Sequence, residues 1–406
     1  MYNFRLNDPA NPIYINYPSL PQVNNLKFKI QSKIKFEKES QDLNCYILIS
    51  ETLNFINSLK ALPNRWARTE NLNVVPRAGK KLNACYDKVS LKFFYDINPN
   101  TKKYIYTVDS TDAIAHELGH AILDTIRPDF WNPQMIEIWS LHETMADITA
   151  LISMLIHTSA IELAIQETNG NLRNSNIITK IAEEIGSVAN FHAKSHSPDF
   201  LRDASIKYYY HNPKNLPKKT SPDKLASAPH SFCRIFTSAW YECFVRIYEI
   251  EVKNMSPLDA VIKSRNYMTK NLFISICKTP RVPNAMEALA KVMIAESEEY
   301  KDVLIDVFKE WKLYSEPTVQ ALSLDVSKTE TKFIHLSEIL LTSLSIKEDP
   351  LLEVPLDTYV ADGEVIQSSY DEAIDAIEFC VNNYIIDQID DSWTIENGKL
   401  ERSYIS

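Results

Sequence analysis

The chain has 406 residues, a formal net charge of −10 and a hydrophobic fraction of 45%. These values are typical of a globular protein with two or three domains, and they exclude a collagen-like, disordered or membrane-embedded chain. Glycine is scarce, since the chain has 6 glycines, whereas the usual share of about 7% would give roughly 28. The glycine-rich loops that cradle phosphate groups do not occur in the sequence. The chemistry of this protein is therefore expected to rest on other residues.

The negative charge belongs to the C-terminal part of the chain. Residues 316–406 hold 19 acidic and 5 basic side chains, a net charge of −14, whereas residues 1–315 hold 34 acidic and 38 basic side chains, a net charge of +4. Nucleic-acid-binding proteins present clustered Lys and Arg on one face. This balance gives no support to a nucleic-acid partner.

Cysteines and apolar segments give no indication of an exported or membrane-bound protein. The six cysteines are widely spaced without a CxxC pair, which favours reduced thiols in a core. No run of 18 apolar residues occurs, and the N-terminal segment has no apolar stretch. We therefore expect a cytoplasmic protein without membrane contact, while export without a cleaved signal stays open.

In chain order, the sequence first predicts a β-rich lobe over residues 1–109. Alternating apolar residues within 1–40 and 72–96 indicate strands, and helical spacing indicates one helix over 42–59. The sequence NPN at 98–100 indicates a turn.

Residues 110–315 are then predicted to form a helical lobe. Ser110 or Thr111 is a suitable N-cap for a helix over 111–126, and Pro128 is a suitable stop. Further helices are expected at 135–157, 159–168, 174–190, 231–253, 257–269, 284–298 and 300–314.

Residues 316–406 are expected to form a small acidic α+β module. It combines a strand-like stretch at 352–360, a helix at 370–385 and a hairpin turn at Asn397-Gly398. The predicted fold class of the whole chain is α+β.

The sequence HELGH at 116–120 lies inside the helix predicted over 111–126. Spacing of i,i+4 places His116 and His120 on one face, where both can bind a zinc ion, with Glu117 beside a metal-bound water. The small Gly119 would let another element pack closely. The alternative, two histidines bonded to nearby backbone, would leave Glu117 buried without a partner.

A catalytic zinc site usually has three protein ligands and a water, so a third ligand is expected. Glu143 and Asp147 stand at i,i+4 on the next predicted helix, where one carboxylate can bind zinc while the other orients a ligating histidine. Asp124 is a competing ligand, less favoured because its own helix can aim only one more group at the metal. His142 points about 100° away from Glu143 and is expected to be a packing residue.

These motifs resemble the thermolysin-like gluzincin metallopeptidases, in which an HExxH helix is followed by a helix bearing ExxxD. The pattern of the metzincins is excluded because Leu123 and Ile126 occupy its further glycine and histidine positions. The resemblance implies a two-lobed zincin in which His116, His120 and Glu143 bind zinc and Asp147 orients a ligand.

The resemblance extends over roughly residues 40–315. Asn83-Ala84 looks like the pair on the family's edge strand that binds the substrate backbone, and Asp112 stands four residues before the first zinc histidine, as in the family. Within residues 201–241, Arg202 and His230 match the family's substrate-binding arginine and catalytic histidine.

Four departures from the family pattern are apparent. His142 replaces an asparagine, and Leu225 replaces the aspartate partner of the catalytic histidine, with Asp223 the nearest acid. Residues 121–142 contain no tyrosine to help bind the oxyanion, which leaves the indole of Trp131 as a candidate helper. The acidic cluster of the family's calcium sites is missing from 148–161, so calcium is not expected and Asp112 is assigned to the helix N-terminus.

The expected function is that of a zinc-dependent endopeptidase acting on a peptide or protein substrate through zinc-activated water, with Glu117 as general base. By resemblance, His230 and Arg202 would donate to the developing oxyanion and to a neighbouring substrate carbonyl. One alternative is a catalytically reduced zinc-binding protein with a regulatory or interaction role. Another is a zinc hydrolase with a non-peptide substrate. The acidic tail is a candidate gate for the cleft.

Overall fold

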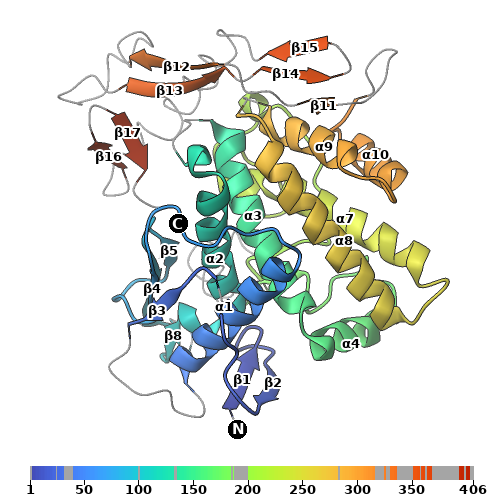
Figure 1. Ribbon diagram of the computed structural model, residues 1–406. Helices are drawn as coiled ribbons and strands as arrows, with labels where there is room; N and C mark the ends of the chain where they lie inside the picture. The colour runs from blue at the N-terminus through green and yellow to red at the C-terminus, as the bar shows by residue number, and fades with distance from the viewer. Residues whose placement is uncertain are drawn as a thin grey trace.

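The computed structural model describes residues 2–23, 25–31, 40–98, 101–131, 135–183, 186, 200–281 and 284–315, followed by the backbone of strands within 324–402. The fold is mixed α+β, as expected, with the strands of the N-terminal part beside a larger body of helices (Figure 1).

A mixed four-stranded sheet organises the N-terminal part. Its strands β3 (Phe28–Ile30), β4 (Leu72–Val75), β6 (Ser90–Phe93) and β5 (Ala84–Tyr86) follow in that spatial order. Strand β4 is parallel to both β3 and β6, whereas β5 is antiparallel to β6 and forms an edge of the sheet. The edge position leaves one side of β5 without a neighbouring strand in the described sheet.

Two hairpin-like sheets and one helix complete this part. Strand β1 (Tyr2–Leu6) pairs with β2 (Ile13–Tyr17), and β7 (Tyr95–Ile97) pairs with β8 (Tyr104–Tyr106). Helix α1 (Gln41–Ser58) begins after Ser40, whose hydroxyl accepts from the Leu43 backbone N–H, so the helix expected over 42–59 is confirmed.

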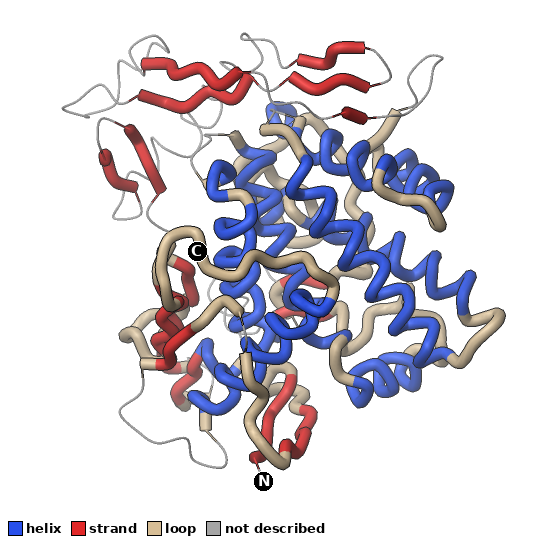
Figure 2. Tube along the Cα trace, in the orientation of Figure 1, coloured by secondary structure: helices blue, strands red, loops and turns tan. Residues whose placement is uncertain are grey.

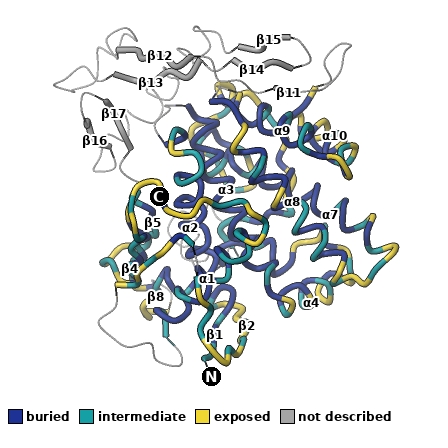
Figure 3. Tube along the Cα trace, viewed as in Figure 1, coloured by how far each residue is buried: buried dark blue, intermediate teal, exposed yellow. Residues whose placement is uncertain are grey.

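Helices α2 (Thr111–Ile126) and α3 (Ile136–Leu155) lie side by side near the centre of the molecule (Figures 1 and 2). Ser110 caps α2 by accepting from the Ala113 backbone N–H, as the sequence predicted. Every residue of α3 is buried, because other elements cover the whole helix (Figure 3). The remaining described helices are α4 (Thr158–Glu167), α6 (Pro229–Phe232), α7 (Arg234–Glu251), α8 (Pro257–Lys278), α9 (Ala285–Ala295) and α10 (Lys301–Glu310).

Two helix predictions need correction. The helix expected over 174–190 is wrong for residues 174–182, which form turns and strand β9 (Lys180–Ile181), paired with β10 (Arg202–Asp203). There the Asn176 side chain accepts from the Ile178 N–H, a local bond that competes with a helix. The helix expected over 231–253 is two helices, α6 and α7, that meet at Cys233.

The C-terminal strands form two further sheets. Strands β11 (Leu324–Asp325), β14 (Thr358–Ala361) and β15 (Glu364–Gln367) form one, and β12 (Glu330–His335), β13 (Leu351–Leu356), β17 (Lys399–Arg402) and β16 (Trp393–Glu396) form the other. The expected helix at 370–385, the turn residues Asn397-Gly398 and most of the turn at 98–100 lie outside the described residues.

One hydrophobic cluster runs through the described part of residues 4–314 and joins the β-rich and helical regions. No single helix of the described residues has the length and apolar character to cross a membrane. Helices α3 and α4 reach that threshold only as a pair, and the pair is bent by 95°.

Gly119 allows the closest approach of α2 to α3. A Cβ atom at this position would lie 2.6 Å from the Ala146 Cα and 3.0 Å from the Met145 carbonyl oxygen. Both atoms belong to the backbone of α3, so they have little freedom to move aside. The expectation that a small residue is needed here is confirmed.

We predict that Gly119→Ala destabilises the protein. Alanine favours a helix by about 1 kcal/mol over glycine, but the overpacking against α3 costs about 1–3 kcal/mol or more, so we expect a net loss of stability in thermal or denaturant unfolding. Gly79→Ala is the matched control, because a Cβ there would meet only the Phe94 ring at 3.7 Å. Equal stability of the two variants would contradict this account of the helix contact.

The buried Glu137 gives stability a pH dependence. It accepts from the Tyr210 hydroxyl (2.8 Å) and from the Met286 N–H (2.9 Å), and burial raises its pKa to about 7. Between the unfolded pKa and about 7, the folded state holds a proton that the unfolded state has lost. The stabilisation from protonated Glu137 is therefore complete below the pKa of this side chain in the unfolded chain. It is lost as the pH rises through the pKa of Glu137 in the folded protein.

We predict that Glu137→Gln removes this dependence. The stability difference between variant and wild type should shift in favour of the variant by up to roughly 3 kcal/mol between pH 5 and 8, measured by denaturant unfolding at several pH values. The same substitution at the exposed Glu298 serves as control and should leave the profile unchanged. If the free energy of unfolding changed with pH in the same way for wild type and Glu137→Gln, this carboxyl would not titrate as described.

Candidate metal centre

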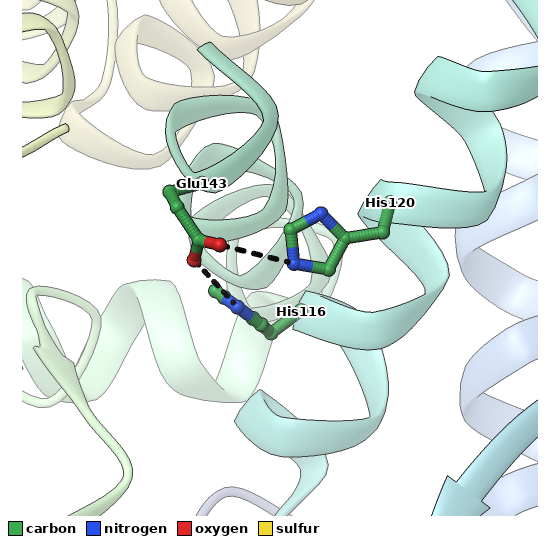
Figure 4. Close-up of side chains that lie close together, drawn as sticks. All are labelled: His116, His120 and Glu143. Atoms are coloured by element: carbon green, nitrogen blue, oxygen red, sulfur yellow. Dashed lines mark ion pairs between the residues drawn. The ribbon is translucent and has the colours of Figure 1, made fainter. Parts of the chain in front are cut away.

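Three buried side chains from two helices converge on one point. His116 and His120 project from one face of α2, and Glu143 projects toward them from α3 (Figure 4). The His116 Nε2 atom lies 3.4 Å from Glu143 Oε2, and the His120 Nε2 atom lies 3.8 Å from Glu143 Oε1. Their ligand atoms all lie within 4.8 Å of one another, and this is the one group of such side chains found among the described residues.

The donor set fits a divalent metal ion. The side chains of His120 and Glu143 are fully buried. Neither nitrogen of the His120 ring and neither oxygen of the Glu143 carboxylate makes a hydrogen bond with the described residues. Buried polar atoms left in this way cost several kcal/mol unless another partner satisfies them. Ligand atoms at about 2.0–2.1 Å from a tetrahedral zinc stand about 3.3 Å apart, close to the observed His116–Glu143 separation. A cation between these residues would bind one nitrogen of each imidazole and the Glu143 carboxylate, and so satisfy the atoms that face one another.

Asp147 holds His116 in place. Its Oδ1 atom lies 3.0 Å from His116 Nδ1, which leaves the Nε2 atom of His116 to face Glu143. Burial alone would lower the pKa of His116, but the hydrogen bond to Asp147 and the nearby Glu143 carboxylate raise it to about 9. Asp147 therefore sits where the sequence predicted a carboxylate that orients a ligand.

Arg202 and Cys233 surround the same carboxylate. The Arg202 guanidinium donates to Asp147 Oδ1 from Nε (3.1 Å) and from an Nη atom (2.7 Å), and the Cys233 thiol donates to Oδ2 at 3.6 Å. Burial acts to raise the pKa of Asp147, but Arg202 and His116 together hold it below its usual value. This carboxylate thus stays ionised in a buried place.

Glu117 stands beside the metal-binding group and lines the cleft. The Tyr86 backbone N–H donates to its carboxylate, and its Oε2 atom has no hydrogen bond. Burial raises the pKa of Glu117 to about 8. A carboxyl with such a pKa can both take and return a proton near neutral pH.

His230 lies in the short helix α6 and reaches the same group. Its Nε2 atom is 3.2 Å from Glu143 Oε2, and its side chain is 40% exposed. The Glu143 pKa, which burial would raise, is held well below its usual range by His230, His120 and His116. The His230 side chain is therefore both next to the metal-binding group and partly exposed to solvent.

The cleft over this group has a volume of about 250 Å³ and is lined by residues of several elements. Asn83 and Ala84 border it from the start of edge strand β5, and Arg202 and His230 border it from the helical side. The residues expected to bind substrate are thus brought together with His116 and Glu117.

The structure places Trp131 elsewhere than expected. The ring is 1% exposed and packs edge-on against Tyr86 (5.5 Å) and His142 (5.4 Å). It is not among the residues that line the cleft. Contacts with Tyr86 and His142 hold the indole in the core, so the expected oxyanion role is withdrawn.

The competing ligand Asp124 belongs to a separate cluster. Its carboxylate accepts from Arg68 at 2.9–3.2 Å and from the Tyr86 hydroxyl at 2.9 Å. It is therefore a structural partner and not a metal ligand. His142 is a buried packing residue, as expected, with Nε2 at 3.2 Å from the Phe130 carbonyl oxygen.

Asp112 and Asp223 complete the sequence-based assignments. Asp112 is in the first turn of α2, where it accepts from the Ala182 N–H at 3.3 Å, and burial raises its pKa well above the usual value. Asp223 is fully exposed and its side chain bonds to Ser221. It does not replace the aspartate partner of His230 that the family pattern has.

Sequence reasoning missed two residues that support the site. Tyr86 contributes its backbone N–H to Glu117, and the Cys233 thiol donates to Asp147. The only sequence signal for these two residues was their closeness to predicted site residues. Tyr86 follows the Asn83-Ala84 pair, and Cys233 follows His230 by three residues.

Comparison of the sequence with protein-family models finds no match, and comparison with curated proteins finds none. The function proposed below therefore rests on the residues and their geometry.

We predict that Asp147→Ala weakens metal binding by roughly 10–100-fold, because His116 loses the partner that orients it. Competition with a chromophoric chelator would measure the affinity. Asp124→Ala is the matched control, since it also removes a buried carboxylate bound to an arginine but leaves the ligands untouched. An Asp147→Ala affinity equal to that of the wild type would show that this residue does not support the site.

Proposed function

We propose that this protein is a zinc-dependent endopeptidase of the thermolysin-like, two-lobed type. The observation that carries the proposal is the buried group of His116, His120 and Glu143, of which His116 lines a cleft that is also bordered by Glu117 and an edge strand. Two imidazoles and one carboxylate, with room for a water, form a ligand set typical of catalytic zinc. When bound, zinc lowers the pKa of a water toward about 7 and polarises a carbonyl group.

Glu117 acts as general base and then general acid. Its free Oε2 atom is available to take a proton from the attacking water, while the Tyr86 N–H fixes the carboxylate in one orientation. The same oxygen then delivers the proton to the leaving amine.

His230 and Arg202 donate to the substrate. His230 is partly exposed at the edge of the cleft, where an imidazole N–H can stabilise an oxyanion. Arg202 uses its Nε and one Nη atom on Asp147, which fixes its guanidinium beside the cleft. A donor held in this way needs no reorganisation when a substrate carbonyl arrives.

Strand β5 binds the peptide backbone. Its outer side has no partner strand in the described sheet, and Asn83 and Ala84 at its start border the cleft. An extended peptide can add to such an edge through backbone hydrogen bonds. This binding mode favours peptides over small non-peptide substrates.

A zinc-binding protein with reduced activity is the second candidate. It is favoured by the burial of Trp131 and the exposure of Asp223, since neither supplies the group that the family pattern has. Such a protein would bind the metal and a peptide but hydrolyse few or none of the members of a peptide library.

We predict that Glu117→Gln abolishes turnover while the protein keeps its metal. Loss of a positioned acid–base group typically costs 10²–10⁴-fold in rate, whereas Glu117 is not among the metal-binding side chains. Digestion of an unstructured peptide library, analysed by mass spectrometry, together with metal analysis of the same samples, would measure both effects.

The control is His120→Ala, which should lose metal and turnover together because it removes a ligand. Undiminished cleavage by Glu117→Gln would exclude this residue as the base. A metal-loaded wild type that cleaves nothing would favour the second candidate.

A further inference from the structure

Helix α6, which carries His230, has four residues and needs contacts outside itself to hold its position. The carboxylate of the family pattern does not supply them, because Leu225 occupies its position and the exposed Asp223 bonds to Ser221. A catalytic group has to be held to within about 0.5 Å of its working position. Other contacts must therefore fix the place of His230 beside Glu143.

Arg234 connects α6 to the loop that precedes it. Its guanidinium donates to the backbone carbonyl oxygens of Pro222, Lys224 and Ser231, and also to the Ser231 hydroxyl. These hydrogen bonds join neighbouring parts of the chain. They do not connect α6 to α3, the helix that carries the metal-binding Glu143.

Cys233, which stands between α6 and α7, makes the connection to α3. Its carbonyl oxygen accepts from the Thr144 hydroxyl at 3.3 Å, and its Sγ atom lies 3.6 Å from Asp147 Oδ2. The same Sγ atom lies 3.3 Å from the carbonyl oxygen of His230. The thiol thus stands between the backbone of His230 and the carboxylate that orients His116.

The Cys233 thiol is a hydrogen-bond donor in this place. The side chain is fully buried and takes part in no disulfide. Burial and the negative charge of Asp147 raise the pKa of the thiol well above its usual value, so it keeps its proton near neutral pH. One proton serves one acceptor at a time, and a carboxylate is a stronger acceptor than a backbone carbonyl. The bond to Asp147 therefore holds α6 against α3.

We propose that Cys233 is a positioning residue for His230, because its thiol holds α6 at the distance from the metal centre that oxyanion binding requires. This inference rests on the proposed peptidase function and adds to it a residue that fixes the oxyanion donor. Asp147 keeps its bonds to His116 and Arg202 when the thiol is removed. Metal binding should therefore depend little on Cys233, and the loss should appear in the transition state.

The first test compares Cys233→Ala (C233A) with C233S. Alanine removes the donor, whereas serine keeps one in a side chain of similar size. C233A should lower kcat roughly two- to tenfold, the usual effect of one hydrogen bond, with KM and metal affinity within about twofold of the wild type. C233S should keep most of the wild-type kcat. Equal kcat values for C233A and C233S, or a loss of metal affinity as large as the loss of kcat, would overturn the assignment.

A double-mutant cycle tests whether Cys233 acts through His230. In a H230A background, C233A should lower kcat by less than about twofold, because the residue that Cys233 positions is gone. Losses that multiply would show that the two residues act independently.

Cys243 provides the matched control. It is as fully buried as Cys233, lies within α7 and does not line the cleft. C243A removes the same thiol from the core and should keep the wild-type kcat. A loss of kcat in C243A equal to that in C233A would attribute the effect to core packing and overturn the inference.

Crystal structures separate this inference from the peptidase proposal. The distance from His230 Nε2 to Glu143 Oε2, 3.2 Å in the wild type, should grow by more than about 0.5 Å in C233A and stay close to the wild-type value in C233S. If the wild type cleaves no peptide but His230 is displaced in C233A, the positioning inference stands and the peptidase proposal fails. If peptides are cleaved and His230 stays in place in C233A, the peptidase proposal stands and the positioning inference fails.

Discussion

Close contact between α2 and α3 at Gly119 is the constraint on which the metal centre depends. The backbone of α3 at Ala146 occupies the space that any side chain at position 119 would need. On α2 the glycine stands between His116 and His120, and on α3 Ala146 stands beside the turn that carries Glu143. The distance between the two helix axes thus sets the separations between the ligands. A wider spacing would leave the carboxylate unable to reach both imidazoles.

That contact buries charged groups that need partners. Helix α3 is buried along its whole length, yet it carries Glu143 and Asp147 in its middle. Asp147 is balanced by His116 and Arg202, and the Cys233 thiol also bonds to it, so β10 and the start of α7 are tied to the centre of the fold. Among the described residues, none donates a hydrogen bond to the Glu143 carboxylate. A bound cation is the simplest partner for it.

The sequence predicted the parts of the site that depend on local spacing. The i,i+4 pairs on α2 and α3 and the cap at Ser110 follow from helix geometry alone. It could not predict where side chains point between elements. Burial of Trp131 depends on the packing of its ring against Tyr86 and His142, and the turns near Asn176 depend on side-chain bonds that override helical spacing. The proximity of His230 to Glu143 likewise depends on the fold of residues 200–230.

The central claim is that the two helices hold one zinc ion, and anomalous X-ray diffraction at the zinc absorption edge tests it most directly. Crystals of the zinc-loaded protein should show one anomalous peak within about 2.0–2.2 Å of His116 Nε2, His120 Nε2 and a Glu143 carboxylate oxygen. The peak should be lost in His120→Ala. A strong peak at other residues, or a zinc-loaded crystal without a peak between these three side chains, would contradict the account.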